Sequence, residues 1–301
     1  MNYGLSYVGS KGLIAEKLVD FLPKGNRLVD LFGGGCAITH CACSKNKYKS
    51  YLYNELNLLV VNCIRKAIRG DFPDTFEFLD KDIFDRRKDH DPISAFCFSF
   101  SADLENYIYP PDMIYWANAM HNIRVFNDNT LFSSIGINTN GTFSDINNNF
   151  DEYIYKYTKY MENLGIGVRA NRSKHAYCEY VPLNRFNRIK SLESLKNKSI
   201  TITQGSYINY KYQDGDVVYC DIPYENTRNA YGSVFDYEQF YNWVASRPYQ
   251  VFFSSYDISD NRFYKVFETN KSSRIAKTDR NGKRPETVYS NIPMKKFAFG
   301  C

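Results

Sequence analysis

No stretch of this 301-residue chain is apolar for long enough to cross a bilayer, and its N-terminus has no signal-peptide pattern. These absences predict an intracellular, cytoplasmic protein that does not enter a membrane. The eight cysteines are scattered irregularly among apolar neighbours, so reduced thiols are expected in place of a disulfide framework. Only His40-Cys41-Ala42-Cys43 approaches a metal-ligand pattern, but cysteines two apart on a helix point away from each other. We therefore expect no metal site.

A large excess of one charge is also missing. The formal net charge is only +5, although residues 265–301 contain nine Lys or Arg against three Asp or Glu. This local bias is compatible with a phosphate-rich partner and equally with an ordinary solvated basic surface. Aromatic residues make up 17% of the chain, and they include 26 tyrosines. Such rings can stack on bases, but most of them pack in cores.

The two ends of the chain alternate between strand and helix patterns. Strands are expected at residues 27–32, 50–53, 199–202, 217–220 and 250–254. Helices are expected at residues 36–43, 56–67, 189–195 and 235–244. This alternation is typical of an α/β domain with a parallel sheet. We assign that domain to residues 1–84 and 185–301.

The alternation fades after about residue 84. Residues 85–184 begin with a charged stretch at 86–91 and contain clusters of Asn, Ser, Thr and Gly around 137–150. We predict an inserted module there, less regular and more polar than the domain that flanks it. No internal repeat or low-complexity linker is evident.

The glycines after the first expected strand indicate a ligand site. Phe32-Gly33-Gly34-Gly35 lies between a strand and a helix, where a ligand can approach the backbone closely. The dinucleotide fingerprint is incomplete, because Ile38 stands where its last glycine belongs. This favours a ligand with an adenosine and no diphosphate. Glu55, 25 residues after Asp30, is placed to accept hydrogen bonds from ribose hydroxyls; alternatively it is a solvated loop acid.

A second candidate site follows the expected strand at 217–220. Asp221-Ile222-Pro223-Tyr224 combines an acid, backbone carbonyls in a stiff turn and an aromatic face. That combination suits a flipped-out base whose exocyclic amine must become nucleophilic. Taken alone, however, such a tetrapeptide is more often a simple turn after a buried strand.

Six elements in register resemble the Dam family of DNA adenine-N6 methyltransferases. In chain order they are Tyr7-Val8-Gly9-Ser10-Lys11, Asp30-Leu31-Phe32-Gly33-Gly34-Gly35, Glu55-Leu56-Asn57, Val218-Tyr219-Cys220-Asp221-Ile222-Pro223-Tyr224, Ser254-Ser255-Tyr256-Asp257 and Arg284-Pro285-Glu286-Thr287-Val288-Tyr289-Ser290-Asn291. The resemblance covers residues 3–84 and 187–291, about two-thirds of the chain. Any one of these motifs is weak, but six in the same order are specific.

The resemblance implies a Rossmann-like sheet that binds S-adenosylmethionine, with residues 85–184 as an inserted target-recognition domain for double-stranded DNA. It implies a monomer, with an associated restriction nuclease as an option, in a bacterial or phage-infected cell. The implied cofactor-binding residues are Tyr7, Lys11, Asp30, Phe32, Gly33, Gly34, Gly35, Glu55 and Asp221, with Lys11 at the methionyl end. The implied catalytic residues are Asp221, Ile222, Pro223 and Tyr224.

These catalytic residues have distinct implied roles. Asp221 and the Ile222 carbonyl would each accept one hydrogen of the adenine amine, which frees the nitrogen lone pair for in-line attack on the sulfonium methyl. Tyr224 would stack on the extruded base. Basic residues of the module and its edge are candidates for contacts to phosphate or guanine, although any single one of them is more often ordinary surface charge; they are Arg86, Arg87, Arg169, Arg172, Lys174, Arg185 and Arg188.

The chain departs from the family pattern at two positions. Ile222 replaces a proline, which keeps the backbone carbonyl but removes a rigid ring. Ser206 stands where the family has an Asp for the adenine amine of the cofactor, so weaker cofactor binding is expected. These departures keep open a catalytically silent DNA-binding protein of the same fold. Cytosine-N4 methylation usually goes with Ser, and protein-glutamine methylation with Asn, at the position of Asp221, which argues against both.

Overall fold

The structure is a computed structural model of the 301-residue chain. It describes residues 3–7, 9–169, 172–225, 235–270 and 285–294, so Val8 and Arg284 of the family-like elements lie outside the described residues. The chain divides into two compact units. The first consists of Met1–Leu5, Gly9–Arg69 and Leu192–Cys301, and the second of Ser6–Val8 and Gly70–Ser191.

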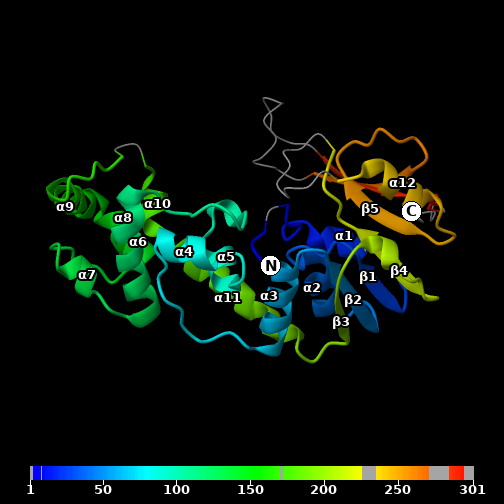
Figure 1. Cartoon of the computed structure of the whole chain (residues 1–301), viewed down its shortest axis with the longest axis horizontal. Helices are drawn as coiled ribbons and strands as arrows, with labels where there is room; N and C mark the ends of the chain where they lie inside the picture. Colours follow the sequence, from blue (N-terminus) through cyan, green and yellow to red (C-terminus); the bar gives the residue numbers. More distant parts are fainter. Residues whose placement is uncertain (1–2, 8, 170–171, 226–234, 271–284, 295–301) are drawn as a thin grey trace, which may run out of the picture. The chain divides into compact units, whose positions relative to one another are not determined.

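A seven-stranded sheet in the order β3-β2-β1-β4-β5-β7-β6 forms the centre of the first unit (Figure 1). Strands β1 to β5 pair in parallel, whereas β7 is antiparallel to both β5 and β6. The strands are β1 (Arg27–Asp30), β2 (Ser50–Glu55), β3 (Ile200–Gln204), β4 (Asp216–Cys220), β5 (Val251–Ser255), β6 (Tyr264–Asn270) and β7 (Pro285–Ser290). The predicted α/β class and all five predicted strands are confirmed.

Helices cover both faces of this sheet. Alternate residues of the central strands, such as Val29 and Val218, pack in one buried cluster with Phe240 and Val244 of α12. On the opposite face, the ring of Phe21 in α1 packs edge-on against Phe252 of β5, with centroids 5.9 Å apart. The helices of this unit are α1 (Ala15–Phe21), α2 (Ala37–Ser44), α3 (Leu58–Arg69) and α12 (Tyr237–Ala245), with short 3-10 turns η4 (Leu192–Leu195) and η5 (Tyr207–Asn209).

The second unit is helical, so the expectation of a less regular module is wrong. Its helices are α4 (Lys81–Arg87), α5 (Pro92–Phe98), α6 (Ile114–His121), α7 (Thr130–Ser133), α8 (Phe143–Asn148), α9 (Phe150–Asn163), α10 (Lys174–Cys178) and α11 (Val181–Ser191), with short turns η1 (Phe100–Ala102), η2 (Pro111–Met113) and η3 (Asn122–Phe126). The unit spans residues 70–191, whereas the sequence placed the insert at 85–184.

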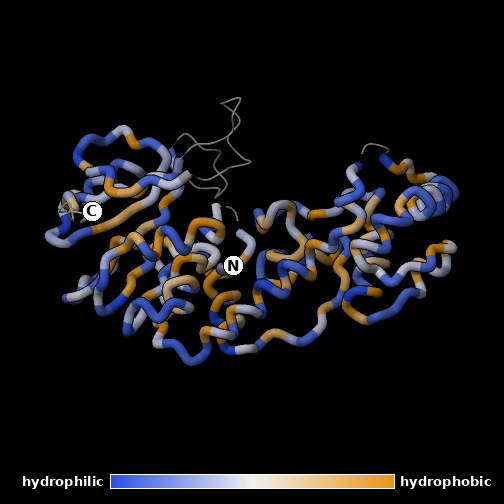
Figure 2. Tube along the Cα trace, turned by 180° about the vertical axis from the view of Figure 1, so that it is seen from behind, coloured by the Kyte–Doolittle hydropathy of each residue, from blue (hydrophilic) through white to orange (hydrophobic). Residues whose placement is uncertain are grey.

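Polar residues that resemble loop signals in the sequence cap these helices. The Asp91 carboxylate accepts hydrogen bonds from the Ile93 and Ser94 amides, and the Thr142 hydroxyl accepts one from the Asp145 amide. The core of the unit is aromatic: the fully buried Trp116 lies 5.2 Å, centroid to centroid, from Tyr157. Figure 2 shows apolar segments inside each unit and polar segments along its outer loops.

The described part of the chain contains no helix with the length and apolar character needed to cross a bilayer. Seven cysteines are described, and all of them are buried free thiols. Cys41 and Cys43 lie on α2, where their burial accounts for them as packing residues.

Candidate active site

The glycine loop lies at the carboxyl end of β1, the strand where the order of the parallel sheet reverses. In parallel α/β sheets, ligands bind in the crevice that forms at the carboxyl ends of the strands where the strand order reverses. The Gly33 amide donates to the Asn54 carbonyl at 2.8 Å, and the Tyr53 hydroxyl donates to the Gly34 carbonyl at 2.7 Å. A Cβ on Gly33 would lie 2.1 Å from the ring of Tyr53, so only glycine fits there. The loop is therefore fixed closely onto β2.

Glu55, the last residue of β2, is part of the same arrangement. Its Oε2 accepts a hydrogen bond from the Gly34 amide at 2.8 Å, and its Oε1 accepts one from the Asn57 amide at 2.9 Å. Asn57 in turn accepts from the Leu59 amide at the start of α3. Each carboxylate oxygen has a second lone pair. Glu55 can thus hold the loop and accept a hydroxyl at the same time, and its predicted ribose contact remains a prediction.

Asp30 is buried beneath this loop, with 1% of its surface exposed. Its Oδ2 accepts a hydrogen bond from the Thr39 hydroxyl at 2.9 Å, whereas Oδ1 has no hydrogen-bond partner among the described residues. Burial raises the pKa of Asp30 to about 7; the Thr39 hydrogen bond opposes this rise, and the charges of Asp221 and Glu55 add to it. The end of β1 therefore presents a buried acid with one unsatisfied oxygen.

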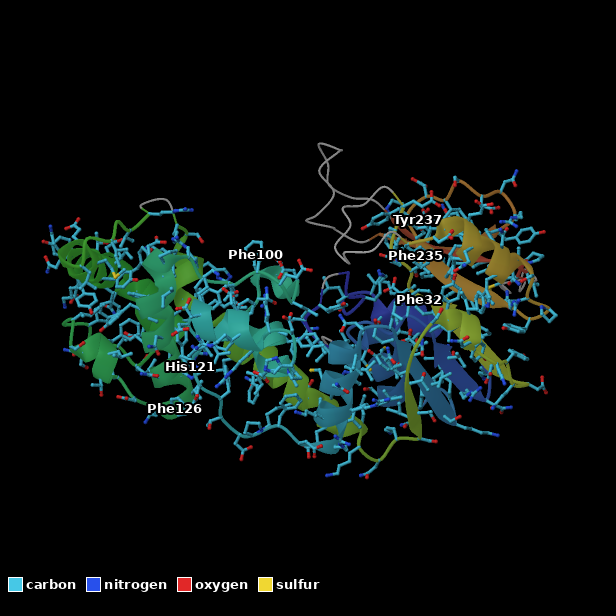
Figure 3. All side chains as sticks on the ribbon, in the orientation of Figure 1. Phe32, Phe100, His121, Phe126, Phe235 and Tyr237 are labelled. Atoms are coloured by element: carbon cyan, nitrogen blue, oxygen red, sulfur yellow. The ribbon has the colours of Figure 1, made fainter. Side chains whose placement is uncertain are left out.

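Aromatic rings lie beside the glycine loop. The ring of Phe32 lies 5.2 Å from that of Tyr207 and 5.9 Å from that of Phe235, and Phe235 lies 5.0 Å from Tyr237 (Figure 3). Sequence reasoning singled out only Phe32 of this group. Ser206, which replaces the expected acid, accepts a hydrogen bond from the Ile208 amide and so caps η5.

The Asp221–Tyr224 turn begins directly after β4, the strand beside β1. Lys11 Nζ lies 2.6 Å from Asp221 Oδ1, and the ammonium also donates to the Gly9 carbonyl at 3.2 Å. Lys11 is 4% exposed, whereas the Asp221 side chain is 20% exposed. Burial lowers the pKa of Lys11, but the charges of Asp221 and Glu286 outweigh burial and hold that pKa above its ordinary value. Lys11 is therefore a permanent cation at the turn.

Ile222 and Tyr224 are fixed by different contacts. Ile222 is 2% exposed and belongs to the buried cluster that includes Val218 and Phe253, so packing holds the turn where a proline is expected. The ring of Tyr224 lies 4.8 Å from Lys11 Nζ and meets the ring of Tyr256 edge-on at 4.6 Å. The turn thus presents a carboxylate and an aromatic ring that are both held in place.

Glu286, on β7, completes the cluster, and sequence reasoning did not assign it to the site. It is 0% exposed, its Oε1 lies 3.3 Å from Lys11 Nζ, and it accepts a hydrogen bond from the Tyr224 hydroxyl. Burial raises the pKa of Glu286 to about 7, while Lys11 lowers it and Asp221 raises it. A signal exists in the sequence, because Glu286 is the lone acid in the strand Pro285–Ser290.

Other predicted residues lie elsewhere. Tyr7 belongs to the second unit, where its ring packs at 6.1 Å from that of Phe96. Arg172 pairs with the buried Asp112 at 2.6 Å, and the half-buried Arg185 donates to the Ser99 carbonyl at 2.5 Å. Arg172 and Arg185 thus have structural roles within this unit, whereas the exposed candidates in it are Arg86, Arg87, Arg169 and Lys174. Within the described ranges, no three His, Cys, Asp or Glu side chains gather as metal ligands.

A family model matches most of the chain. The model of the family described as D12 class N6 adenine-specific DNA methyltransferase matches residues 7–274. The matched span includes the glycine loop, Glu55, the Asp221–Tyr224 turn and the whole range 70–191 of the second unit. A search among curated proteins finds no match.

Proposed function

Because the chain belongs to the D12 class N6 adenine-specific DNA methyltransferases, which use S-adenosylmethionine as methyl donor, we propose that the Asp221–Tyr224 turn is its catalytic centre. The seven-stranded, mostly parallel sheet is consistent with the fold of such enzymes. One observation carries the proposal: a partly exposed carboxylate, Asp221, lies at the carboxyl end of β4, paired with the buried ammonium of Lys11.

The described residues fit S-adenosylmethionine. Gly34 of the glycine loop is half-buried at the end of β1, the aromatic rings of Phe32, Tyr207 and Phe235 form an apolar wall beside it, and Asp30 Oδ1 is buried without a partner among the described residues. We assign the ribose to Glu55, and we assign to Lys11 the positive charge that attracts the methionyl carboxylate. When bound, the cofactor supplies an electrophilic methyl group on its sulfonium.

Two acceptors activate the adenine amine. The lone pair of this nitrogen is delocalised into the ring, so it is a poor nucleophile in the free base. The Asp221 carboxylate accepts one amine hydrogen and the Ile222 carbonyl accepts the other, which drives the nitrogen toward sp3 geometry and frees its lone pair. As positive charge develops on the nitrogen, the amine proton would pass along its hydrogen bond to the Asp221 carboxylate and from there to water. Catalysis consists of positioning and electrostatics, without a covalent enzyme intermediate.

The target base must leave the duplex to reach this turn, because its amine is inaccessible within the stack. The Tyr224 ring then provides a surface on which the base can stack. Stacking of a base on an aromatic ring usually contributes about 1–3 kcal/mol. The edge-on contact of the Tyr224 ring with Tyr256 supports the ring from the side.

The target-recognition role falls to the helical second unit, the counterpart of the insert predicted at residues 85–184. Its exposed basic side chains, Arg86, Arg87, Arg169 and Lys174, are available for phosphate contacts. The enzyme would act as a monomer on one strand at a time, in the cytoplasm where its DNA substrate lies. An associated restriction nuclease stays a prediction.

The test is direct labelling of DNA. The protein is incubated with mixed-sequence DNA and methyl-labelled S-adenosylmethionine, and the modified nucleoside is identified by mass spectrometry. N6-methyladenine is expected with the wild type and none with D221A. Unmodified DNA despite preserved cofactor and DNA binding would identify a silent binder, and label on cytosine would overturn the adenine assignment.

A further inference from the structure

The fully buried Glu286 is not needed by the reaction as described above, and yet it contacts two of the residues assigned to the catalytic turn. Thr287 pairs with Ser255, the last residue of β5, so Glu286 lies at the carboxyl end of the sheet, as Asp221 does. It accepts a hydrogen bond from the Tyr224 hydroxyl and forms an ion pair with Lys11. Residues from the beginning, middle and end of the chain therefore meet here.

A purely structural role does not explain an acid at this position. Burying a carboxylate is unfavourable unless a cation compensates it, and Lys11 is already paired with Asp221 at 2.6 Å. Among these three side chains, one ammonium thus faces two carboxylates, an excess of one negative charge when both acids are ionised. A glutamine or an apolar residue would fill the strand without that excess.

The geometry around Lys11 shows what the second carboxylate does. An ammonium has three N–H donors, and three oxygens surround Nζ: Asp221 Oδ1 at 2.6 Å, the Gly9 carbonyl at 3.2 Å and Glu286 Oε1 at 3.3 Å. Without the charge of Glu286, the ammonium has only one anionic partner, and its hydrogen bonds turn toward Asp221. Asp221 would then be a weaker acceptor for the adenine amine.

We propose that Glu286 is a positioning residue, an inference that rests on the proposed function. Glu286 shares the Lys11 ammonium with Asp221 and holds the Tyr224 ring through the Tyr224 hydroxyl. Both Asp221 and Tyr224 are thereby kept in position for the flipped-out adenine. The charge of Glu286 acts on Asp221 through Lys11, and its oxygen acts on the base through Tyr224. Glu286 itself does not touch the reacting atoms.

The main experiment compares E286Q with E268Q in single-turnover methyl transfer at saturating cofactor and DNA. Glu268 lies on β6, the antiparallel neighbour of β7, and forms an exposed pair with Lys265, so E268Q is a matched control. The E286Q rate is expected to fall by about tenfold to a hundredfold, as for other misplaced catalytic groups, with the cofactor Kd within about twofold of wild type. A wild-type rate in E286Q, or a loss that merely follows a loss of folded protein, would overturn the proposal.

The pH profile separates positioning from simple structural support. The titratable groups that face Glu286 are Lys11, Asp221, Tyr224 and Tyr219, and Asp30 lies near Asp221. Because the pKa of Glu286 is about 7, its carboxylate is present at pH 8.5 and largely protonated at pH 6. The ratio of wild-type to E286Q rates is therefore expected to be larger at pH 8.5 than at pH 6. A ratio that does not change with pH would contradict a role for the charge.

A double variant tests the route through Tyr224. Y224F keeps the ring but removes the hydroxyl that donates to Glu286. If both residues act through this contact, E286Q/Y224F loses less activity than the product of the two single losses, since coupled residues are not additive. Fully multiplicative losses would overturn this part of the proposal.

A readout without catalysis keeps this proposal distinct from the proposed function. A wild type that methylates no DNA would overturn the proposed function only. The burial that raises the pKa of Glu286 to about 7 also makes the folded state lose stability as pH rises from about 5 through 7. E286Q is expected to reduce this loss in urea unfolding, whereas E268Q is not. An unchanged pH dependence in E286Q would overturn the charge cluster itself.

Discussion

The two halves of the proposed active site are held by different forces. Around the glycine loop, neutral backbone amides, the Tyr53 hydroxyl and close contact at Gly33 fix the chain, and Glu55 contributes the single charge. Around the Asp221–Tyr224 turn, buried charges of both signs hold the residues together. The glycine-loop half depends on close packing, so almost no atom can be added there without a steric overlap. The second depends on charge balance, which shape-conserving substitutions can disturb.

The largest effect on the charged half is expected from D221A. The substitution removes the acceptor for the amine hydrogen and leaves Lys11 paired with Glu286 alone, so we expect methyl transfer to fall by at least about a hundredfold. Asp221 is itself among the implied cofactor-binding residues, but its loss leaves Lys11, Glu55 and the glycine loop in place, so cofactor affinity should stay within about threefold, a change worth under 1 kcal/mol. Single-turnover rates and calorimetric cofactor binding measure the two quantities. A large loss of cofactor affinity in D221A would show that the two halves are not separate.

The corresponding disruption of the shape-dependent half is G33A. The added Cβ would meet the Tyr53 ring at 2.1 Å, and relief of this overlap should cost about 1–3 kcal/mol of stability, the range for overpacked sites. Cofactor binding should weaken with it, because the loop moves away from β2. The control is G167A, where nothing lies within 4 Å of the added atom. Urea unfolding of both variants decides this, and equal stabilities would contradict the tight packing at Gly33.

The same difference between shape and charge explains which parts of the fold and of the site could be predicted from the sequence. The strands at 217–220 and 250–254 are continuous apolar runs, and the glycine loop and Glu55 lie next to strand ends, so local pattern sufficed for them. Strands β6 and β7 escaped prediction, because they lie in a stretch where charged residues interrupt the apolar ones. Their antiparallel pairing is a tertiary feature that no local pattern specifies.

The helical second unit shows a missed local signal. In α9, the buried Phe150, Tyr153, Tyr157 and Met161 recur at helical spacing, yet the Asn, Ser, Thr and Gly clusters around residues 137–150, directly before them, resemble a loop. The contact of Glu286 with Lys11 is a different case. Its partners come from opposite ends of the chain, and only the folded sheet brings them together. Motif resemblance could place Asp221 and Lys11 at one site, but it could not show which charge balances which.

Stability as a function of pH sharpens the comparison at Asp30, which lies between the two halves. Its pKa, about 7 in the folded protein, is above the ordinary 3.8, so its contribution to stability is fully present below about pH 4 and is lost as pH rises through 7. D30N removes this titration. Between pH 5 and pH 8 the free energy of unfolding of D30N should therefore decrease by about 2 kcal/mol less than that of the wild type. Urea midpoints at the two pH values measure this. Parallel wild-type and D30N profiles would mean that folding does not raise the pKa of Asp30.

The smallest effect is expected from E55Q, which probes the one charge in the shape-dependent half. The amide oxygen of glutamine can still accept the hydrogen bond from the Gly34 amide, so the loop should keep its place, but its NH2 group cannot accept the hydrogen bond from the Asn57 amide, and stability should fall by about 1 kcal/mol. The charge-assisted bonds to ribose hydroxyls would be lost, and cofactor affinity should fall by about tenfold, the equivalent of one such bond. The single-turnover rate at saturating cofactor should stay near that of the wild type, because Asp221 is untouched. E193Q, which changes an exposed acid on η4, is the control. A fall in the saturated rate of E55Q, with cofactor affinity intact, would mean that Glu55 acts on the charged half of the site and not on the cofactor.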